Sequence, residues 1–315
     1  MKTPPEFFFA IGDPRIRDFT VARMVGQHAF LVSAGTRGER MLRTMPGVRV
    51  LLDSGAWPIV NPQRVTREQF WWIVRWWSRD SRFTYAMSYD HILDPQRSAE
   101  DHAWLLAQPW DTEVPPVVRV AHYPTATADD IIGEALHDLA DLTSSEIAEL
   151  QSLRQRGFVV GDPYQPKVAI GGLVPAHGDN ESRDWYNALL SDLSSQQAEL
   201  LDMSERRMHL LGVSKPDWVN HPLVASFDSS TPARMAALGG WKAIAKRYDS
   251  AFGISAEKLQ RSREARLAYH LIRIRNAVGL PWTRPNECDL LDDKDCQKWQ
   301  HRNQQANSTM PMMLL

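Results

Sequence analysis

HAFLVSAGTRGERMLRTMPGVRVLLDSG, residues 28–55, contains one complete strand–helix–strand unit. Its two apolar runs, residues 28–35 and 48–55, are near-continuous in apolarity, which is typical of strands that are buried on both faces. The segment between them, residues 37–44, predicts a helix. Two buried strands joined by a crossover helix predict a parallel sheet, because parallel neighbours need such a connection.

The same unit recurs along most of the chain. Six further apolar runs predict strands at residues 7–12, 84–90, 114–122, 167–173, 207–213 and 223–230. Helices are expected at residues 14–26, 37–44, 66–80, 95–110, 127–156, 182–206 and 231–248. Eight strands that alternate with helices predict an α/β fold, a (β/α)8 TIM-type barrel with inserted helices. A doubly wound sheet is the competing fold, and the lack of a GxGxxG or GxxxxGKS/T phosphate loop argues against it.

The domain prediction places the barrel at residues 1–250 and a C-terminal extension at residues 251–315. The extension begins with a long basic helix, residues 255–278, and continues as a polar tail. Within the barrel, the tryptophan-rich helix FWWIVRWW (70–77) is expected to pack Trp72, Ile73 and Trp76 against the core, because they share one face by helical spacing.

Composition excludes several classes of protein. The chain has 315 residues, 43% of them hydrophobic, and a formal net charge of -2, so it can bury a large core and does not attract polyanions over its whole surface. No apolar run approaches the length of a membrane span, and the start has no secretion signal, so no membrane partner is expected. The cysteine count of 2 is too low for a disulfide framework and fits a cytoplasmic protein.

Carboxylates follow three of the predicted strands. Asp53 in LLDSGAW, Asp90 in SYDHILDP and Asp228 in SFDSS stand where the carboxyl ends of strands would form the mouth of the barrel. Three carboxylates from different strands can divide the roles of nucleophile, proton transfer and substrate recognition. For each one alone the alternative is a helix cap or a turn, since aspartate often serves there.

The ordered set LLDSGAW, SYDHILDP, IGGLVP, HLLGVSKPDWV and SFDSSTPAR resembles the tRNA-guanine transglycosylase superfamily over roughly residues 7–248. The resemblance is closest to its DNA-directed branch, the phage and bacterial enzymes that insert 7-deazaguanines into DNA. It implies a (β/α)8 barrel that exchanges guanine for a 7-deazapurine through a covalent glycosyl-enzyme intermediate.

The resemblance also implies roles for individual residues. Asp228 matches the nucleophile that attacks C1′ of the deoxyribose, Asp53 the carboxylate that handles protons and base contacts, and Asp90 the aspartate that reads the amidine edge of the base. The tRNA enzymes place a glutamine after the fifth strand, where this chain has VVRVAHY, so Arg119 or His122 is expected to fill that role. The other residues expected to bind substrate are Ser54, Gly55, Gly171, Gly172 and Gly212.

Two further sites are expected outside the mouth. Basic residues that follow Asp228 or lie on the C-terminal helix predict contacts to nucleic-acid phosphates, with a solvated helix face as the alternative: Arg234, Lys242, Lys258, Arg261, Arg263 and Arg266. The tRNA enzymes carry a structural zinc after the last strand. Cys288, Cys296 and His301 are candidate ligands here, although a structural site normally has four, and an ordinary polar tail is the alternative.

The leading hypothesis is a DNA-guanine transglycosylase that inserts a base such as 7-cyano-7-deazaguanine and needs no cofactor for its chemistry. The expected partners are DNA and the small 7-deazaguanine base, and a homo-oligomer is left open. Three alternatives remain: the same exchange on tRNA, a noncatalytic nucleic-acid-binding subunit on the same fold, and an unrelated glycosidase, because barrel carboxylates also serve sugar hydrolysis. The expected location is the cytoplasm, which would be the host's if a phage encodes the chain.

Overall fold

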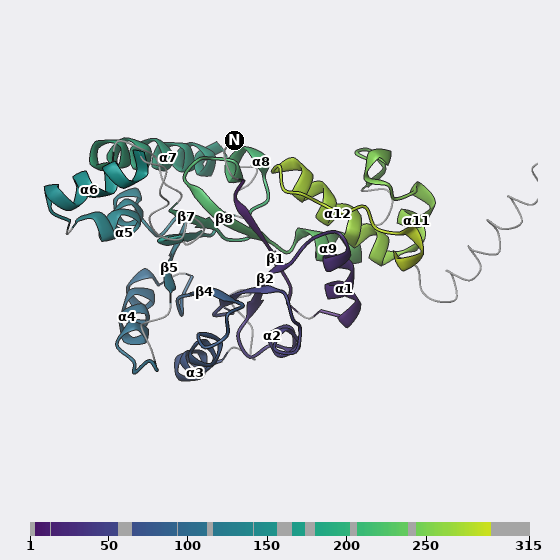
Figure 1. Ribbon diagram of the computed structural model, residues 1–315, viewed down its shortest axis with the longest axis horizontal. Helices are drawn as coiled ribbons and strands as arrows, with labels where there is room; N and C mark the ends of the chain where they lie inside the picture. Colours follow the sequence, from purple (N-terminus) through teal and green to yellow (C-terminus); the bar gives the residue numbers. More distant parts are fainter. Residues whose placement is uncertain are drawn as a thin grey trace, which may run out of the picture. The chain divides into compact units, whose positions relative to one another are not determined.

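The computed structural model describes residues 4–12, 14–55, 65–92, 94–111, 116–140, 142–155, 166–173, 180–201, 207–238 and 244–290. Eight parallel strands close into one barrel, and each strand pairs with the next along the chain until the eighth pairs with the first (Figure 1). The strands are β1 (Glu6–Ala10), β2 (Ala29–Ser33), β3 (Arg49–Asp53), β4 (Phe83–Met87), β5 (Val117–His122), β6 (Val168–Gly171), β7 (Met208–Leu210) and β8 (Val224–Ser229). The predicted (β/α)8 barrel is confirmed.

Side chains from every second residue fill the interior of the barrel. Its core includes Phe8, Leu31, Leu51, Tyr85 and Val120, all buried. Since strand side chains alternate between faces, residues two positions further toward the carboxyl end of a strand point to the same interior. Asp53 follows Leu51 and His122 follows Val120 in this way, so both side chains belong to the mouth.

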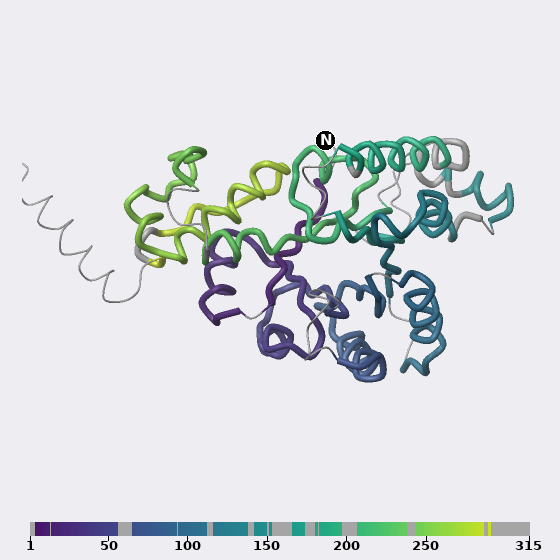
Figure 2. Tube along the Cα trace, turned by 180° about the vertical axis from the view of Figure 1, so that it is seen from behind, coloured from purple at the N-terminus to yellow at the C-terminus, as the bar shows by residue number. Residues whose placement is uncertain are grey.

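Helices cover the outside of the strands in the unit formed by residues 1–13 and 28–230 (Figure 2). They are α2 (Arg37–Leu42), α3 (Arg67–Trp77), α4 (Pro95–Leu106), α5 (Ala128–Ala140), α6 (Ser144–Gln155), α7 (Asn180–Leu201) and α8 (Pro216–Val219). The helical segment predicted at residues 127–156 is divided into α5 and α6, which agrees with the inserted helices expected in the barrel; the second helix begins after Thr143. The Thr143 backbone amide donates to Glu146 Oε2 (2.8 Å) and the Glu146 amide donates back to Thr143 Oγ1 (3.4 Å).

The tryptophan-rich helix α3 faces the barrel differently from the prediction. Its buried residues are Phe70, Val74 and Trp77, which form a stripe at four- and three-residue spacing. Trp72 and Trp76 instead lie on the outside, 57% and 40% exposed. Helical spacing allows two apolar faces on this helix, and the face that is buried in the structure is not the predicted one.

A second unit comprises residues 14–27 and 231–315, so the division of the chain differs from the predicted boundary at residue 250. Its elements are α1 (Ile16–Met24), α9 (Thr231–Leu238), η1 (Ser250–Phe252), α11 (Ala256–Arg261), α12 (Arg263–Ala277) and η2 (Glu287–Leu290). Within this unit α12 packs against α9 and α1. The predicted helix 255–278 is two helices, because Ser262 adopts an extended conformation (φ -107°, ψ 126°) and its hydroxyl caps α12.

No helix in the described ranges is long and apolar enough to cross a membrane.

Candidate active site

Four of the predicted residues meet at the carboxyl ends of the barrel strands. Asp53 ends β3, His122 ends β5, Asp90 follows β4, and Asp228 lies one residue before the end of β8. The pKa of Asp53 responds to the charges of both Asp90 and Asp228, so the three carboxylates lie close enough to interact. The predicted convergence at the mouth is therefore present in the structure.

Asp228 is buried, and the described residues hold it through one of its two oxygens. His209 Nε2 lies 3.2 Å from Asp228 Oδ1, and the Gly212 backbone amide donates to the same oxygen at 2.9 Å. Gly212 has a φ of +72°, a left-handed conformation that glycine adopts without strain. Both of these contacts leave Oδ2 as the oxygen that can face a substrate.

A buried polar cluster beneath the mouth orients His209. The Tyr85 hydroxyl lies 2.9 Å from His209 Nδ1 and 2.8 Å from Ser226 Oγ, while Ser226 Oγ lies 2.9 Å from His209 Nδ1. Burial raises the pKa of Tyr85 well above its usual value, so the phenol keeps its proton and can donate it to Nδ1. With Nδ1 accepting, the remaining ring proton belongs on Nε2, where it points at the Asp228 carboxylate.

Asp53 has the electrostatic character of a group that exchanges protons near neutrality. Burial, together with the nearby charges of Asp90 and Asp228, raises its pKa from 3.8 to about 7, although hydrogen bonds from Gly55 and Ser33 oppose the shift. The Gly55 amide donates to Asp53 Oδ2 at 3.1 Å and the Ser33 hydroxyl donates at 3.2 Å. Gly55 has a φ of +78°, which lets its amide turn back toward the carboxylate.

Asp90 forms a buried triad with Ser54 and His122. The Ser54 hydroxyl donates to Asp90 Oδ1, and His122 Nε2 lies 2.7 Å from Asp90 Oδ2. All three side chains are buried. The second ring nitrogen of His122, Nδ1, is buried and has no hydrogen-bond partner among the described residues. A buried ring nitrogen without a hydrogen-bond partner is suited to contact a ligand.

The glycine pair of IGGL creates space next to this triad. A Cβ atom on Gly171 would lie 2.5 Å from His122 Nδ1, so only glycine lets the imidazole occupy its position. A Cβ atom on Gly172 would lie 2.2 Å from the Tyr123 carbonyl oxygen, and the φ of Gly172 is +78°. These glycines therefore shape the wall beside His122.

Arg119 does not belong to the mouth. It alternates with Val118 and Val120, which point into the barrel core, so its side chain points outward and pairs with Glu134 of α5 at 3.1 Å. There it lines a cavity of about 30 Å³ between β5, α4 and α5, together with His91 and Ser98. His122 also lines this cavity, but of the two candidates in VVRVAHY only His122 contacts Asp90.

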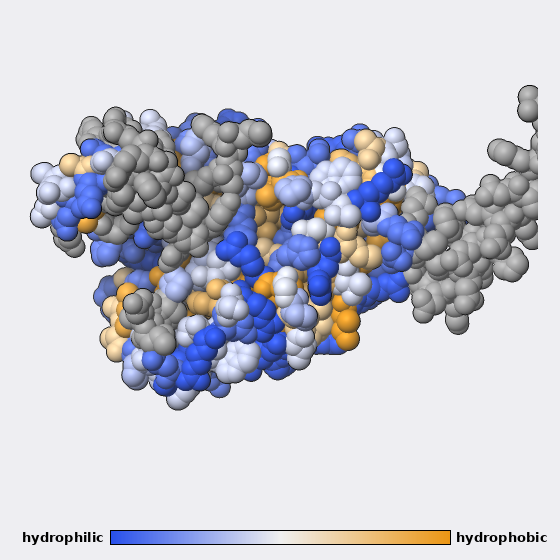
Figure 3. All heavy atoms as spheres, in the orientation of Figure 1, coloured by the Kyte–Doolittle hydropathy of each residue, from blue (hydrophilic) through white to orange (hydrophobic). Residues whose placement is uncertain are grey.

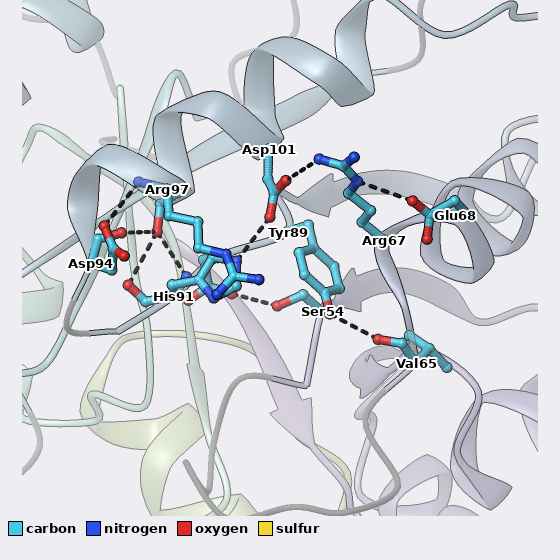
Figure 4. Close-up of polar contacts among 11 residues, drawn as sticks. Ser54, Val65, Arg67, Glu68, Tyr89, His91, Asp94, Arg97 and Asp101 are labelled. Carbon is cyan, nitrogen blue, oxygen red and sulfur yellow. Dashed lines mark hydrogen bonds and ion pairs between the residues drawn. The ribbon is translucent and has the colours of Figure 1, made fainter.

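A second polar chain runs beside the triad (Figure 4). His91, which follows Asp90, has Nε2 2.8 Å from Asp101 Oδ2, and Arg67 donates to the other Asp101 oxygen at 2.8 Å. The Tyr89 hydroxyl donates to the Val65 carbonyl oxygen at 2.9 Å. This chain fixes the loop after β4, which contains Asp90, to the start of α3 and to α4.

The predicted phosphate-binding residues of the second unit are mostly engaged within it. Lys258 is buried, Arg263 pairs with Asp18 of α1, and Arg266 donates to the Ala236 and Leu259 carbonyl oxygens at 3.1 and 3.0 Å. Arg261 is exposed but pairs with Glu257 at 3.0 Å. Arg234 is exposed, and Lys242 lies outside the described residues. The prediction of a basic helix face fails for Lys258, Arg263 and Arg266 because they hold α11 and α12 in place.

The predicted zinc ligands cannot be placed. Cys296 and His301, and the side chain of Cys288, lie outside the described residues. Among the residues that the structure does describe, no group of three or more His, Cys, Asp or Glu side chains could hold a metal ion.

The sequence analysis missed the residues beneath the carboxylates. Ser33, Tyr85, His209 and Ser226 all belong to strands and contact Asp53 or Asp228 directly or through His209. Strand alternation could have found Ser226, because it stands two residues before Asp228 and so shares its face. The signal for Tyr85 and His209 was weaker, since the strand register shifts beside both.

No protein-family model and no curated protein matches the chain. Among solved structures, the chain is similar to the YdjI aldolase from Escherichia coli K12, with 12% identity, 88% of this chain and 92% of that chain covered, and a TM-score of 0.40. It is also similar to the carboxyl transferase domain from Rhizobium etli pyruvate carboxylase, with 11% identity, 96% and 53% coverage, and a TM-score of 0.31. Similarities this low carry no argument about function.

Proposed function

We propose that this protein is a glycosyltransferase that exchanges guanine in DNA for a 7-deazaguanine base through a covalent aspartyl-glycosyl intermediate. The observation that carries the proposal is the meeting of Asp53, Asp90 and Asp228 in one barrel mouth, with Asp228 anchored through a single oxygen. The resemblance of the sequence to the DNA-directed transglycosylases supplies the substrate class.

Asp228 is the nucleophile in this mechanism. Its free oxygen attacks C1′ of the deoxyribose, the bond between C1′ and the guanine nitrogen breaks, and the electron pair of that bond leaves with the base. The reacting sugar passes through an oxocarbenium-like state, which a nearby carboxylate stabilises and then captures. The His209 and Gly212 contacts to Oδ1 hold the carboxylate in one orientation, so that Oδ2 faces the sugar.

Asp53 transfers the proton in both half-reactions. With a pKa of about 7, it is present in comparable amounts as acid and as carboxylate at neutral pH. The acid donates its proton to the leaving guanine. The carboxylate then takes a proton from the incoming base, whose nitrogen attacks C1′ and displaces Asp228. The proton count balances, and no cofactor takes part in these steps.

Asp90 and His122 hold the base in this proposal. An ionised Asp90 accepts hydrogen bonds from the amidine edge of a guanine-like base, and its orientation is set by Ser54 and His122. His122 Nδ1 adds a contact that the glutamine supplies in the tRNA enzymes. Gly171 lets the His122 ring take the position from which it meets the base.

A base in a duplex is out of reach of these groups, so the DNA must be single-stranded or its nucleotide extruded. The proposal places the reaction in the cytoplasm.

A labelled-base assay tests this function. The protein is incubated with radiolabelled 7-cyano-7-deazaguanine and either guanine-containing DNA or tRNA, and each polymer is then digested to nucleosides. Label in deoxynucleosides supports the proposal, and label only in ribonucleosides would assign the exchange to tRNA. If neither polymer takes up label, while wild-type protein and an Asp228→Asn control behave alike, the exchange function is wrong.

A further inference from the structure

The helices α2 and α3 carry an exposed aromatic and basic surface that the barrel does not use. Trp72 and Trp76 are 57% and 40% exposed and stand one helical turn apart, so they lie on the same side of α3. Exposed apolar side chains that are grouped together mark interaction sites.

Buried contacts hold arginines against these rings. Glu39 of α2 is buried and accepts from Trp77 Nε1 at 2.8 Å and from Arg43 Nε at 2.6 Å. These two bonds place the Arg43 guanidinium 4.4 Å from the centre of the Trp76 ring. Burial of Trp77 therefore fixes the relative position of Arg43 and Trp76.

A second carboxylate, Asp111, holds an arginine next to the Trp72 ring. Asp111 accepts from Arg75 Nε at 2.8 Å and also pairs with Arg79. The Arg75 guanidinium lies 5.1 Å from the centre of the Trp72 ring. Each exposed ring thus has a guanidinium group next to it before any ligand arrives.

The charge of this surface is positive. Residues 37–44 and 65–82 contain the arginines Arg37, Arg40, Arg43, Arg67, Arg75, Arg79 and Arg82 and the carboxylates Glu39, Glu68 and Asp80. Asp101 and Asp111 pair with members of this set. With these two carboxylates included, the surface has seven positive and five negative charges. Arg37 and Arg40 are exposed, and no carboxylate pairs with them among the described residues. Figure 3 shows a largely hydrophilic surface over these two helices.

The surface leads toward the barrel mouth. Arg37 and Arg67 begin α2 and α3, whereas Arg43 and Trp76 lie at or near the ends of these helices. Barrel helices start near the carboxyl ends of the strands and run back along the outside. An extended chain that leaves the mouth can therefore follow α3 for about 16 Å, the length of 11 helical residues.

We propose that Trp72, Trp76 and the arginines around them form a binding track for single-stranded DNA that continues from the nucleotide held in the mouth. Aromatic platforms next to a row of cations are what unpaired nucleic acid requires, since bases stack on the rings and phosphates meet the guanidinium groups. Arginine also suits this role better than lysine, because its planar group binds phosphate and stacks. This inference rests on the proposed function for the identity of the polymer.

The test measures binding and base exchange separately. Affinity for a fluorescein-labelled oligothymidylate of about 20 nucleotides, a length that covers one such track, is measured by anisotropy at several salt concentrations. Trp72→Ala and Trp76→Ala should each weaken binding about 5- to 100-fold, and Trp→Phe at either position should restore part of it, because a ring remains for stacking. Arg40→Gln should reduce the steepness of the log–log salt dependence by about 0.7, the value for one single-strand phosphate.

Two variants serve as matched controls. Leu106→Ala removes an exposed apolar side chain from α4, and Arg23→Gln removes an exposed charge from α1. Both should bind the oligonucleotide like the wild type. Unchanged binding by the Trp72 and Trp76 variants overturns the track, as does an equal loss in the controls.

The measurement of oligonucleotide binding also distinguishes a failure of this inference from a failure of the proposed function. Loss of oligonucleotide binding in the tryptophan variants supports the track even if the wild type exchanges no base. Normal base exchange together with unchanged oligonucleotide binding in the same variants would refute the track and leave the proposed function intact.

Discussion

His209 Nε2 lies 3.2 Å from Asp228 Oδ1 in the interior of the barrel, and both side chains are buried. The imidazole is fixed from its other side by Tyr85 and Ser226, so its contact with the carboxylate has one geometry. Because the described residues bind this carboxylate only through Oδ1, it can present Oδ2 to a substrate in a single direction. The proposed nucleophile is thus oriented by a residue that the substrate does not touch.

Replacement of His209 tests this orientation. His209→Phe removes the donor to Asp228, and loss of a hydrogen bond to a charged group corresponds to about 10- to 100-fold in rate. We expect kcat for base exchange to fall by that factor while KM for the free base stays the same, because His209 does not contact the base. His209→Gln keeps an N–H donor and should recover part of the rate. A variant that loses thermal stability but keeps kcat would assign His209 a purely structural role.

Asp228→Asn should abolish the covalent intermediate. An amide is a poor nucleophile, and single substitutions of this kind lower turnover by about four orders of magnitude or more. Asn keeps an oxygen that can accept from His209 and Gly212, so the fold should persist. Wild-type protein mixed with guanine-containing DNA without free base should give a protein–DNA adduct on a denaturing gel, and the variant should give none. An adduct of normal yield in the variant would transfer the nucleophile role to another residue.

The barrel was predictable because it depends on a pattern that is repeated eight times. Each strand is a short, almost continuous apolar run, and errors of a few residues at strand ends do not change the topology. Asp53, Asp90 and Asp228 were found for the same reason, since the ends of strands meet at one face whatever the packing beneath them.

Residues whose position depends on tertiary contacts were not predictable. Arg119 and His122 both belong to VVRVAH, and only the register of β5 decides that one points outward to Glu134 and the other inward to Asp90. Likewise, the helical spacing of FWWIVRWW admits two apolar faces, and the bond from Trp77 to Glu39 favours the one that leaves Trp72 and Trp76 outside. Arg263 is predicted to contact phosphate because its partner Asp18 lies 245 residues away in the chain, where no local pattern reveals the pair.

Gly171→Ala should disturb the Asp90 triad through His122. The new methyl group would lie 2.5 Å from His122 Nδ1, so the ring must move and weaken its 2.7 Å contact with Asp90. Overpacking of this kind costs about 1–3 kcal/mol of stability. In a His122→Ala background the clash is absent and the same substitution should cost little stability, which a double-mutant cycle of thermal unfolding measures.

Gly133→Ala is the control, since its Cβ would meet nothing within 4 Å in helix α5. Equal costs of Gly171→Ala in both backgrounds would contradict the predicted clash.

Asp53→Asn should make the protein more stable than the wild type at alkaline pH. The pKa of Asp53 is about 7 in the folded chain and 3.8 in its ordinary state, so between these values the folded chain binds a proton that the unfolded chain releases. Stability therefore falls as pH rises through this window, and above pH 7 the wild type retains a buried charge that disfavours folding. Asn cannot ionise, yet it offers an oxygen to Gly55 and Ser33. The melting temperature of the variant relative to the wild type should rise from pH 5 to pH 8.

Asp80→Asn is the control. Its partner Arg82 lowers the pKa of Asp80, so that carboxylate is ionised throughout the window, and its substitution should have the same effect at both pH values. A difference between Asp53→Asn and wild type that does not change with pH would show that Asp53 is ionised throughout and cannot serve as the acid.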